Sequence, residues 1–190
     1  ITNRLVGSEM CIRDRKYWKD AGHVARRTLE AMKLELTPGK TFHEVIESAE
    51  RYIHRHGGKP AFPGTIAVND LAAHFTTDHA INHVEGWDGE MILQKGDCVK
   101  IDFGVHIKGH LADNALTFEI GNGNEHTEQI KAAKEARDAA IEMMHPGTPW
   151  YKVGQAAAQP SLDAGFQPIR NLCGHQLKPC LLYTSPSPRD

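Results

Sequence analysis

The most informative segment of the chain runs from Lys100 to Phe118 and reads KIDFGVHIKGHLADNALTF. Two β-rich runs flank Lys108-Gly109, a pair that suits a two-residue hairpin turn. A turn there makes Asp102 and Asp113 diagonal neighbours on one face of the hairpin, with Cα atoms about 7–8 Å apart. The register predicted by this turn pairs Ile107 with His110, Gly104 with Asp113, and Asp102 with Ala115.

The opposite face of the same hairpin is apolar. We predict that it packs under helices, and it carries Ile101, Phe103, Val105 and Ile107. Two like charges above an apolar backing are costly unless a cation neutralises them. Such a pair can bridge two metal ions about 3.5–4 Å apart. The pair alone leaves open a solvated hairpin with two unrelated aspartates.

Helical patterns precede the hairpin. From Lys16 onward, apolar residues recur at three- and four-residue steps and predict an amphipathic helix: Trp18, Ala21, Ala25, Leu29 and Met32. Thr41 forms a predicted capping box with Glu44 and opens a second helix through about His56. Pro60 and Pro63 then hold the chain extended.

Further strands and helices are predicted from the local composition and from the positions of proline and glycine. We expect β-strands around residues 65–68, 98–107 and 110–120. An alanine-rich helix is expected at about residues 126–144, and another starts at Thr148, where Pro160 is expected to bend or interrupt it. This mixture predicts the α+β fold class.

The two helical regions are related in sequence. A shift of 108 residues aligns eight identical residues without a gap: Ala25 with Ala133, Ala31 with Ala139, Pro38-Gly39 with Pro146-Gly147, Val45 with Val153, Ala49 with Ala157, Gly57 with Gly165, and Pro60 with Pro168. This agreement favours an internal duplication, with two α/β halves about a pseudo-twofold axis.

The composition suits a single globular domain whose cysteines are reduced. The chain has 190 residues and a net charge of −2, which disfavours nucleic acid or a membrane surface as the main partner. Its four cysteines show no metal or disulfide spacing, and no run approaches the roughly 20 apolar residues of a membrane span. We therefore expect a cytoplasmic protein with no secretory signal.

The two ends differ from the middle of the chain. Residues 1–15 (ITNRLVGSEMCIRDR) show no clear helical or strand period, and residues 179–190 end in a Ser/Pro-rich tail. Both resemble translated sequencing adapters, so we expect non-native tails at 1–15 and 179–190 around a partial catalytic domain at 16–178. Neither end is expected to pack well.

Three stretches of the chain carry a family pattern: GGKPAFPGTIAVNDLAAHFT at 57–76, the segment with Asp102 and Asp113, and NLCGH, which ends at His175. With these stretches in this order, residues Tyr17 to Leu177 resemble the type-two methionine aminopeptidases. The resemblance implies a pita-bread fold, C-terminally incomplete in this chain, with a central cleft that holds two divalent ions. The native metal is not specified: cobalt, manganese, iron and zinc all suit carboxylate and imidazole ligands.

The resemblance also implies a role for each site residue. Asp102 binds one metal, Asp113 bridges both, and His175 binds the other. His74 lies beside the scissile carbonyl and steadies the tetrahedral intermediate. Phe62, which we expect to pack in the core, lines the pocket for the methionine side chain. The implied reaction is hydrolytic removal of N-terminal methionine from nascent chains, by an enzyme that is monomeric at full length.

The family's two glutamate ligands and second histidine are expected after His175, but no glutamate follows Glu142. The chain as given is therefore expected to be inactive. Two alternatives are an Xaa-Pro dipeptidase, which AAHFT and KPAFP disfavour, and a non-enzymatic pita-bread protein that binds ribosomes or RNA. The latter commonly loses metal ligands, whereas the three expected in this chain are present.

Overall fold

The computed structural model describes residues 2–77, 91–121, 123–172, 174, 176–178 and 181–183. The chain forms two compact units, one built from residues 1–121 and 175–190 and the other from residues 122–174. Each unit is described by itself. No helix in the described part of the chain has both the length and the apolar character needed to cross a bilayer.

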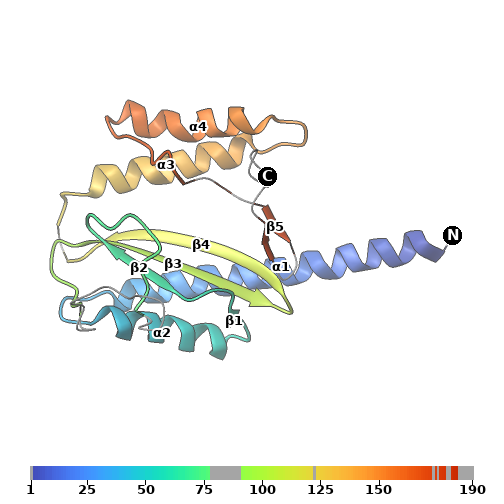
Figure 1. Ribbon diagram of the computed structural model, residues 1–190, viewed down its shortest axis with the longest axis horizontal. Helices are drawn as coiled ribbons and strands as arrows, with labels where there is room; N and C mark the ends of the chain where they lie inside the picture. Colours follow the sequence, from blue (N-terminus) through green and yellow to red (C-terminus); the bar gives the residue numbers. More distant parts are fainter. Residues whose placement is uncertain are drawn as a thin grey trace. The chain divides into compact units, whose positions relative to one another are not determined.

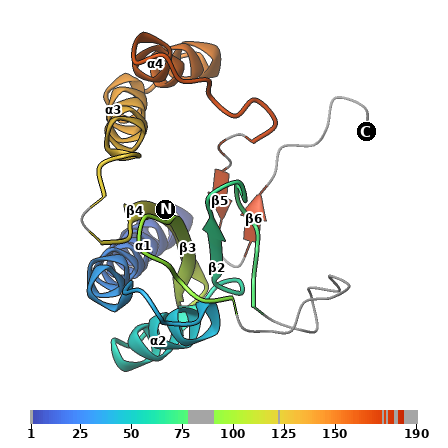
Figure 2. The same cartoon turned by 90° about the vertical axis from the view of Figure 1, so that its left-hand side faces the viewer.

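The first unit is an antiparallel sheet with two helices on one face (Figures 1 and 2). Its central strand is β3 (Cys98–Ile107), which pairs along its whole length with β4 (His110–Glu119). The other edge of β3 is shared by β1 (Lys59–Pro60) and β2 (Thr65–Val68). The predicted strands are thereby confirmed, and the extended stretch at Pro60 is β1.

Helices α1 (Thr2–Glu35) and α2 (Phe42–Arg55) cover the apolar face of this sheet. The predicted stripe of α1 is buried at Ala21, Ala25, Leu29 and Met32, each at most 3% exposed. It packs on Ile101, Phe103 and Val105 of β3, which are at most 1% exposed. Burial of this apolar area is the main stabilising term of the unit.

The N-terminal end of α1 corrects the sequence analysis. Residues 2–15, which showed no helical period, continue the helix that was predicted only from Lys16. Propagating a helix from a packed segment costs far less than nucleating one, so sequence of weak periodicity can extend it. Asp14 also contacts strand β4, with Oδ1 3.0 Å from Nε2 of His110. At the other end, β5 (Gln176–Lys178) pairs with β6 (Leu181–Tyr183), so the expected tail contributes a short strand.

The second unit is a helical hairpin of α3 (Thr127–Met143) and α4 (Trp150–Asp163). Both helices lie where the sequence predicts them, and Pro149 precedes the first turn of α4. The predicted interruption at Pro160 is wrong, because α4 continues through it to Asp163. A proline this close to a helix end removes a single backbone hydrogen bond, which the remaining turns tolerate.

The helical hairpin of α1 and α2 in the first unit and that of α3 and α4 in the second correspond element by element. Helix α4 starts and ends 108 residues after α2, and α3 ends 108 residues after α1. The turn glycines share a left-handed conformation, with φ of 92° and 87° at Gly39 and Gly147 and of 79° and 82° at Gly57 and Gly165. Shared turn geometry supports the internal duplication; the pseudo-twofold relation stays a prediction.

Candidate metal centre

The β3–β4 hairpin has the register that the sequence predicts. Gly104 faces Asp113, Asp102 faces Ala115, and Ile107 faces His110. Lys108 and Gly109 both take positive φ, 50° and 80°, as a type I′ turn requires. This turn matches the twist of the strands and thereby fixes which residues share a face.

Asp102 and Asp113 therefore project from the same face of the sheet, as predicted. Ile101 and Phe103, the chain neighbours of Asp102, point the other way and are at most 1% exposed, whereas both aspartates are half-buried. Carboxylate oxygens on a partly buried surface suit divalent ions, and a bound cation would offset their mutual repulsion. The donor chemistry of this face thus fits the metal that the sequence implies.

The third expected ligand, His175, lies outside the described residues. Within the described ranges, no group of three or more histidine, cysteine, aspartate or glutamate side chains is close enough to hold a metal. The hairpin supplies two of the three ligands expected in this chain, and the place of the third stays a prediction.

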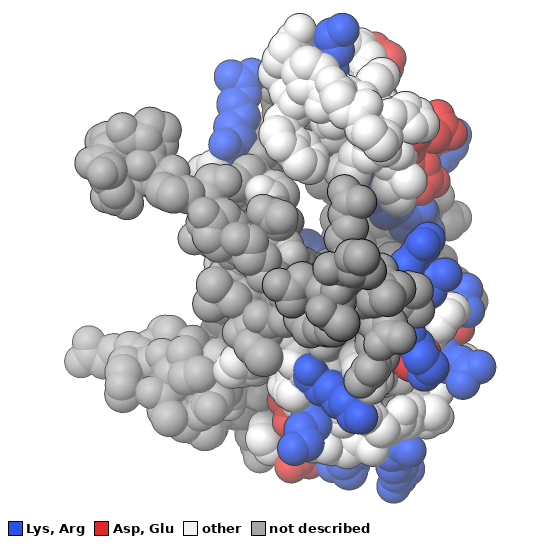
Figure 3. Space-filling model, turned by 90° about the vertical axis from the view of Figure 1, so that its right-hand side faces the viewer, with Lys and Arg blue, Asp and Glu red and all other residues white. Residues whose placement is uncertain are grey.

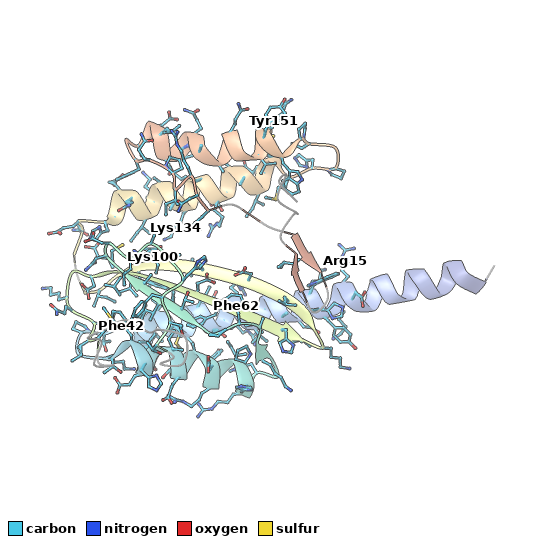
Figure 4. The ribbon with its side chains drawn as sticks, in the orientation of Figure 1. Arg15, Phe42, Phe62, Lys100, Lys134 and Tyr151 are labelled. Atoms are coloured by element: carbon cyan, nitrogen blue, oxygen red, sulfur yellow. The ribbon has the colours of Figure 1, made fainter. Side chains whose placement is uncertain are left out.

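Phe62 lies against the same face of the sheet as the aspartates. A side chain at Gly104 would project from that face, and its Cβ would lie 2.3 Å from Cε1 of Phe62. The backbone fixes this approach, since the Ala61 N–H donates to the Gly104 carbonyl at 2.9 Å. Figure 4 shows Phe62 at the sheet and Phe42 on α2. Among the described residues, those of the helix-covered core do not include Phe62, whereas the sequence analysis expects Phe62 to pack in the core.

His74 lies in the loop that follows β2. Its φ of 64° is left-handed, unusual for a non-glycine residue, and its side chain is exposed. The neighbouring Phe75 accepts a hydrogen bond from the Ile66 N–H at 2.8 Å and packs edge-on against Phe42 in the core. Phe75 thus packs on the helix-covered side, and the position of the exposed His74 side chain relative to the aspartates stays a prediction.

Asn69 anchors the start of this loop, a role that the sequence did not predict. Its φ is 51°, its Oδ1 accepts from the Cys98 N–H at 2.9 Å, and its Nδ2 donates to Asp97 at 3.0 Å. Lys100, on the aspartate-bearing face, donates from Nζ to the Asn69 carbonyl at 2.7 Å. Burial lowers the pKa of this lysine. An asparagine directly after a β-strand was the available signal, because asparagine favours left-handed turns.

Comparison with known proteins defines the class. Residues 16–184 match metallopeptidase family M24, and the chain belongs to this family. The match covers the hairpin, the His74 loop and both helical hairpins.

Individual relatives narrow the resemblance. The methionine aminopeptidase of Archaeoglobus fulgidus is 38% identical over 168 residues, covering 88% of this chain and 54% of that protein. The one from Thermococcus onnurineus is 36% identical over 83% of this chain and 50% of its own length. That of Methanothermus fervidus is 32% identical, with 90% of both chains covered. The chain spans about half the length of the first two relatives.

Solved structures agree on the fold. The methionine aminopeptidase from Rickettsia prowazekii superposes with a TM-score of 0.79 at 21% identity, covering 92% of this chain and 69% of that one. The prolidase from Pyrococcus furiosus gives 0.65 at 26% identity, covering 80% of this chain and 43% of its own. The predicted α+β pita-bread fold is confirmed over the part of these proteins that the chain covers.

Proposed function

We propose that the protein, at the length of its archaeal relatives, removes N-terminal methionine from peptides by metal-assisted hydrolysis. The observation that carries this proposal is the placement of Asp102 and Asp113 on one face of the hairpin, in a chain of family M24. The named relatives at 31–38% identity are methionine aminopeptidases, which favours methionine as the residue removed.

The proposed metal site uses two divalent ions. Asp102 would hold one, Asp113 would be shared by both, and His175 would hold the other, and the metal would be cobalt, manganese, iron or zinc. When bound, such ions activate water and polarise the peptide carbonyl. The half-buried aspartates support this assignment, since burial strengthens their interaction with a cation.

The proposed roles of the remaining site residues concern the substrate. His74 donates a hydrogen bond to the oxygen on which negative charge develops, and its exposed position in an anchored loop supports this role. Phe62 forms one wall of the pocket for the methionine side chain, and its ring on the aspartate-bearing face supports this.

The proposed partners are methionyl peptides and nascent chains. Figure 3 shows lysine and arginine as well as aspartate and glutamate side chains on the described part of one face. The net charge of −2 supports a protein whose main partners are neither nucleic acids nor membranes. A free, buried Cys98 is compatible with the cytoplasm, where we place a monomeric enzyme.

The 190-residue chain by itself is proposed to be inactive. Three ligands supply too little negative charge to hold two dications, and the sequence has no glutamate after Glu142. Tests of activity therefore use the gene extended to the length of the archaeal relatives.

The extended protein, stripped with a chelator and supplied with manganese or cobalt, should release methionine from Met-Ala-Ser. Without added metal, release should stay at background. Cleavage before proline in Ala-Pro peptides, without release of methionine, would instead establish the Xaa-Pro dipeptidase alternative. No hydrolysis of either peptide by a folded, metal-loaded protein would refute the proposed function.

A further inference from the structure

We propose that Gly104 is a positioning residue that sets the depth of the substrate side-chain pocket through Phe62. The inference rests on the proposed function, and it goes beyond it by assigning a specificity role to a residue that has no side chain.

The contact geometry at Gly104 supports this role. A Cβ built there would lie 2.3 and 2.4 Å from Cε1 and Cδ1 of Phe62, and 2.9 Å from the Cβ of Ala61. These separations are well inside van der Waals contact, so the ring occupies the space that any other residue at position 104 would fill. Phe62 can lie this close to the sheet only because position 104 is glycine.

The position of Gly104 gives this contact a functional consequence. Gly104 faces Asp113 across the hairpin and lies two residues after Asp102, so Phe62 lies on the aspartate-bearing face. The ring cannot slide freely along the sheet, because Pro60 pairs with Val105 and the Ala61 N–H is bonded to Gly104. A methyl group at position 104 must therefore move the ring outward, away from the sheet.

The expected effect of this outward movement is a shallower pocket. Phe62 is half-buried with its ring against Gly104, and in the proposed function its exposed part contacts the substrate side chain. When the ring moves toward the ligand, a long N-terminal side chain such as methionine loses room before a short one does. One methylene in such a pocket changes discrimination by about 10–200-fold.

The test compares two substrates in the extended, metal-loaded enzyme: Met-Ala-Ser and its analogue with N-terminal 2-aminobutyrate, whose side chain is shorter. Gly104→Ala should lower the kcat/KM ratio of the methionyl to the shorter peptide about tenfold. The change should arise in KM, with metal content unchanged. In a Phe62→Leu background the same substitution should have a much smaller effect, because the smaller side chain leaves space for the methyl group.

Gly58→Ala is the matched control. Its Cβ would also be crowded, at 2.8 Å from Cγ1 of Val105, but on the helix-covered side of β3. It should lower stability without changing the substrate ratio. If Gly104→Ala does not fold, the double variant Gly104→Ala/Phe62→Leu is compared with Phe62→Leu instead. The proposal is supported if the double variant folds and its kcat/KM ratio for the two peptides is close to that of Phe62→Leu.

An unchanged kcat/KM ratio of the two peptides in Gly104→Ala would overturn the inference. So would an equal fall of this ratio when Gly104→Ala is introduced into Phe62→Leu. A wild-type enzyme that hydrolyses neither peptide would refute the proposed function, a result distinct from failure of Gly104 in an active enzyme.

Discussion

His74 combines an exposed imidazole with a left-handed backbone in a loop held at both ends. If it stabilises the developing oxyanion, His74→Ala should lower turnover of the extended enzyme about 10²–10³-fold while metal content stays the same. Turnover and metal content are measured on one preparation. His23→Ala, which removes an exposed histidine from α1, is the control and should leave both unchanged. Full turnover in metal-replete His74→Ala would remove the histidine from the mechanism.

Asn69 tests whether that loop is anchored as its contacts indicate. Asn69→Ala loses both side-chain hydrogen bonds and also strains a φ of 51°, so we expect about 2–3 kcal/mol of destabilisation. Asn69→Gly loses the same bonds without the strain and should cost about 1 kcal/mol less. Denaturant unfolding of the two variants measures the difference. Equal stabilities would show that backbone strain at this position is negligible.

At the scale of the elements, α2 illustrates how local sequence fixes a boundary. The predicted capping box is present: the Glu44 N–H donates to the Thr41 hydroxyl at 3.1 Å, and the Thr41 N–H donates to the Glu44 carboxylate at 2.8 Å. Thr41→Ala should destabilise the protein by about 1 kcal/mol in denaturant unfolding. Thr37→Ala, an exposed turn threonine, should change stability by less than about 0.5 kcal/mol. Equal losses in both variants would argue against the cap.

The capping box also has a pH dependence. Hydrogen bonds from Thr41, its backbone N–H first, hold the pKa of Glu44 below its ordinary value of 4.5. A carboxyl with a lowered folded-state pKa contributes stability that is present above pH 4.5 and is lost as the pH falls through the lowered value. Glu44→Gln should therefore flatten the pH dependence of stability below pH 4.5. An unchanged acid slope in Glu44→Gln would contradict this cause.

Local patterns predicted the elements well because their causes are local. The apolar stripe of α1, the cap of α2 and the Lys108-Gly109 turn each depend on residues within a few positions of one another. The contact of Phe62 with Gly104 joins segments 42 residues apart, and no period or motif in the sequence reports it. The extension of α1 to Thr2 was missed because helix propagation needs no amphipathic stripe.

At the scale of the whole molecule, a small number of sequence features predict the fold. The hairpin turn and strand alternation predict that Asp102 and Asp113 share one face, and the 108-residue shift predicts the paired helical hairpins. The site itself was predicted only in part. The His74 loop is fixed by Asn69 and Lys100, which act through long-range hydrogen bonds. His175, outside the described residues, stays a prediction.

The central claim is that the aspartate pair holds the metals on which hydrolysis depends. The most direct test measures bound metal and methionine release together, on the extended protein and its Asp113→Asn variant, with Asp138→Asn on exposed α3 as the control. Asp113→Asn should fold, bind less than about one equivalent of metal, and release methionine only at background, because the residue is proposed to bridge both ions. Asp138→Asn should match the parent in both measurements. Full metal content and normal methionine release by Asp113→Asn would contradict the account.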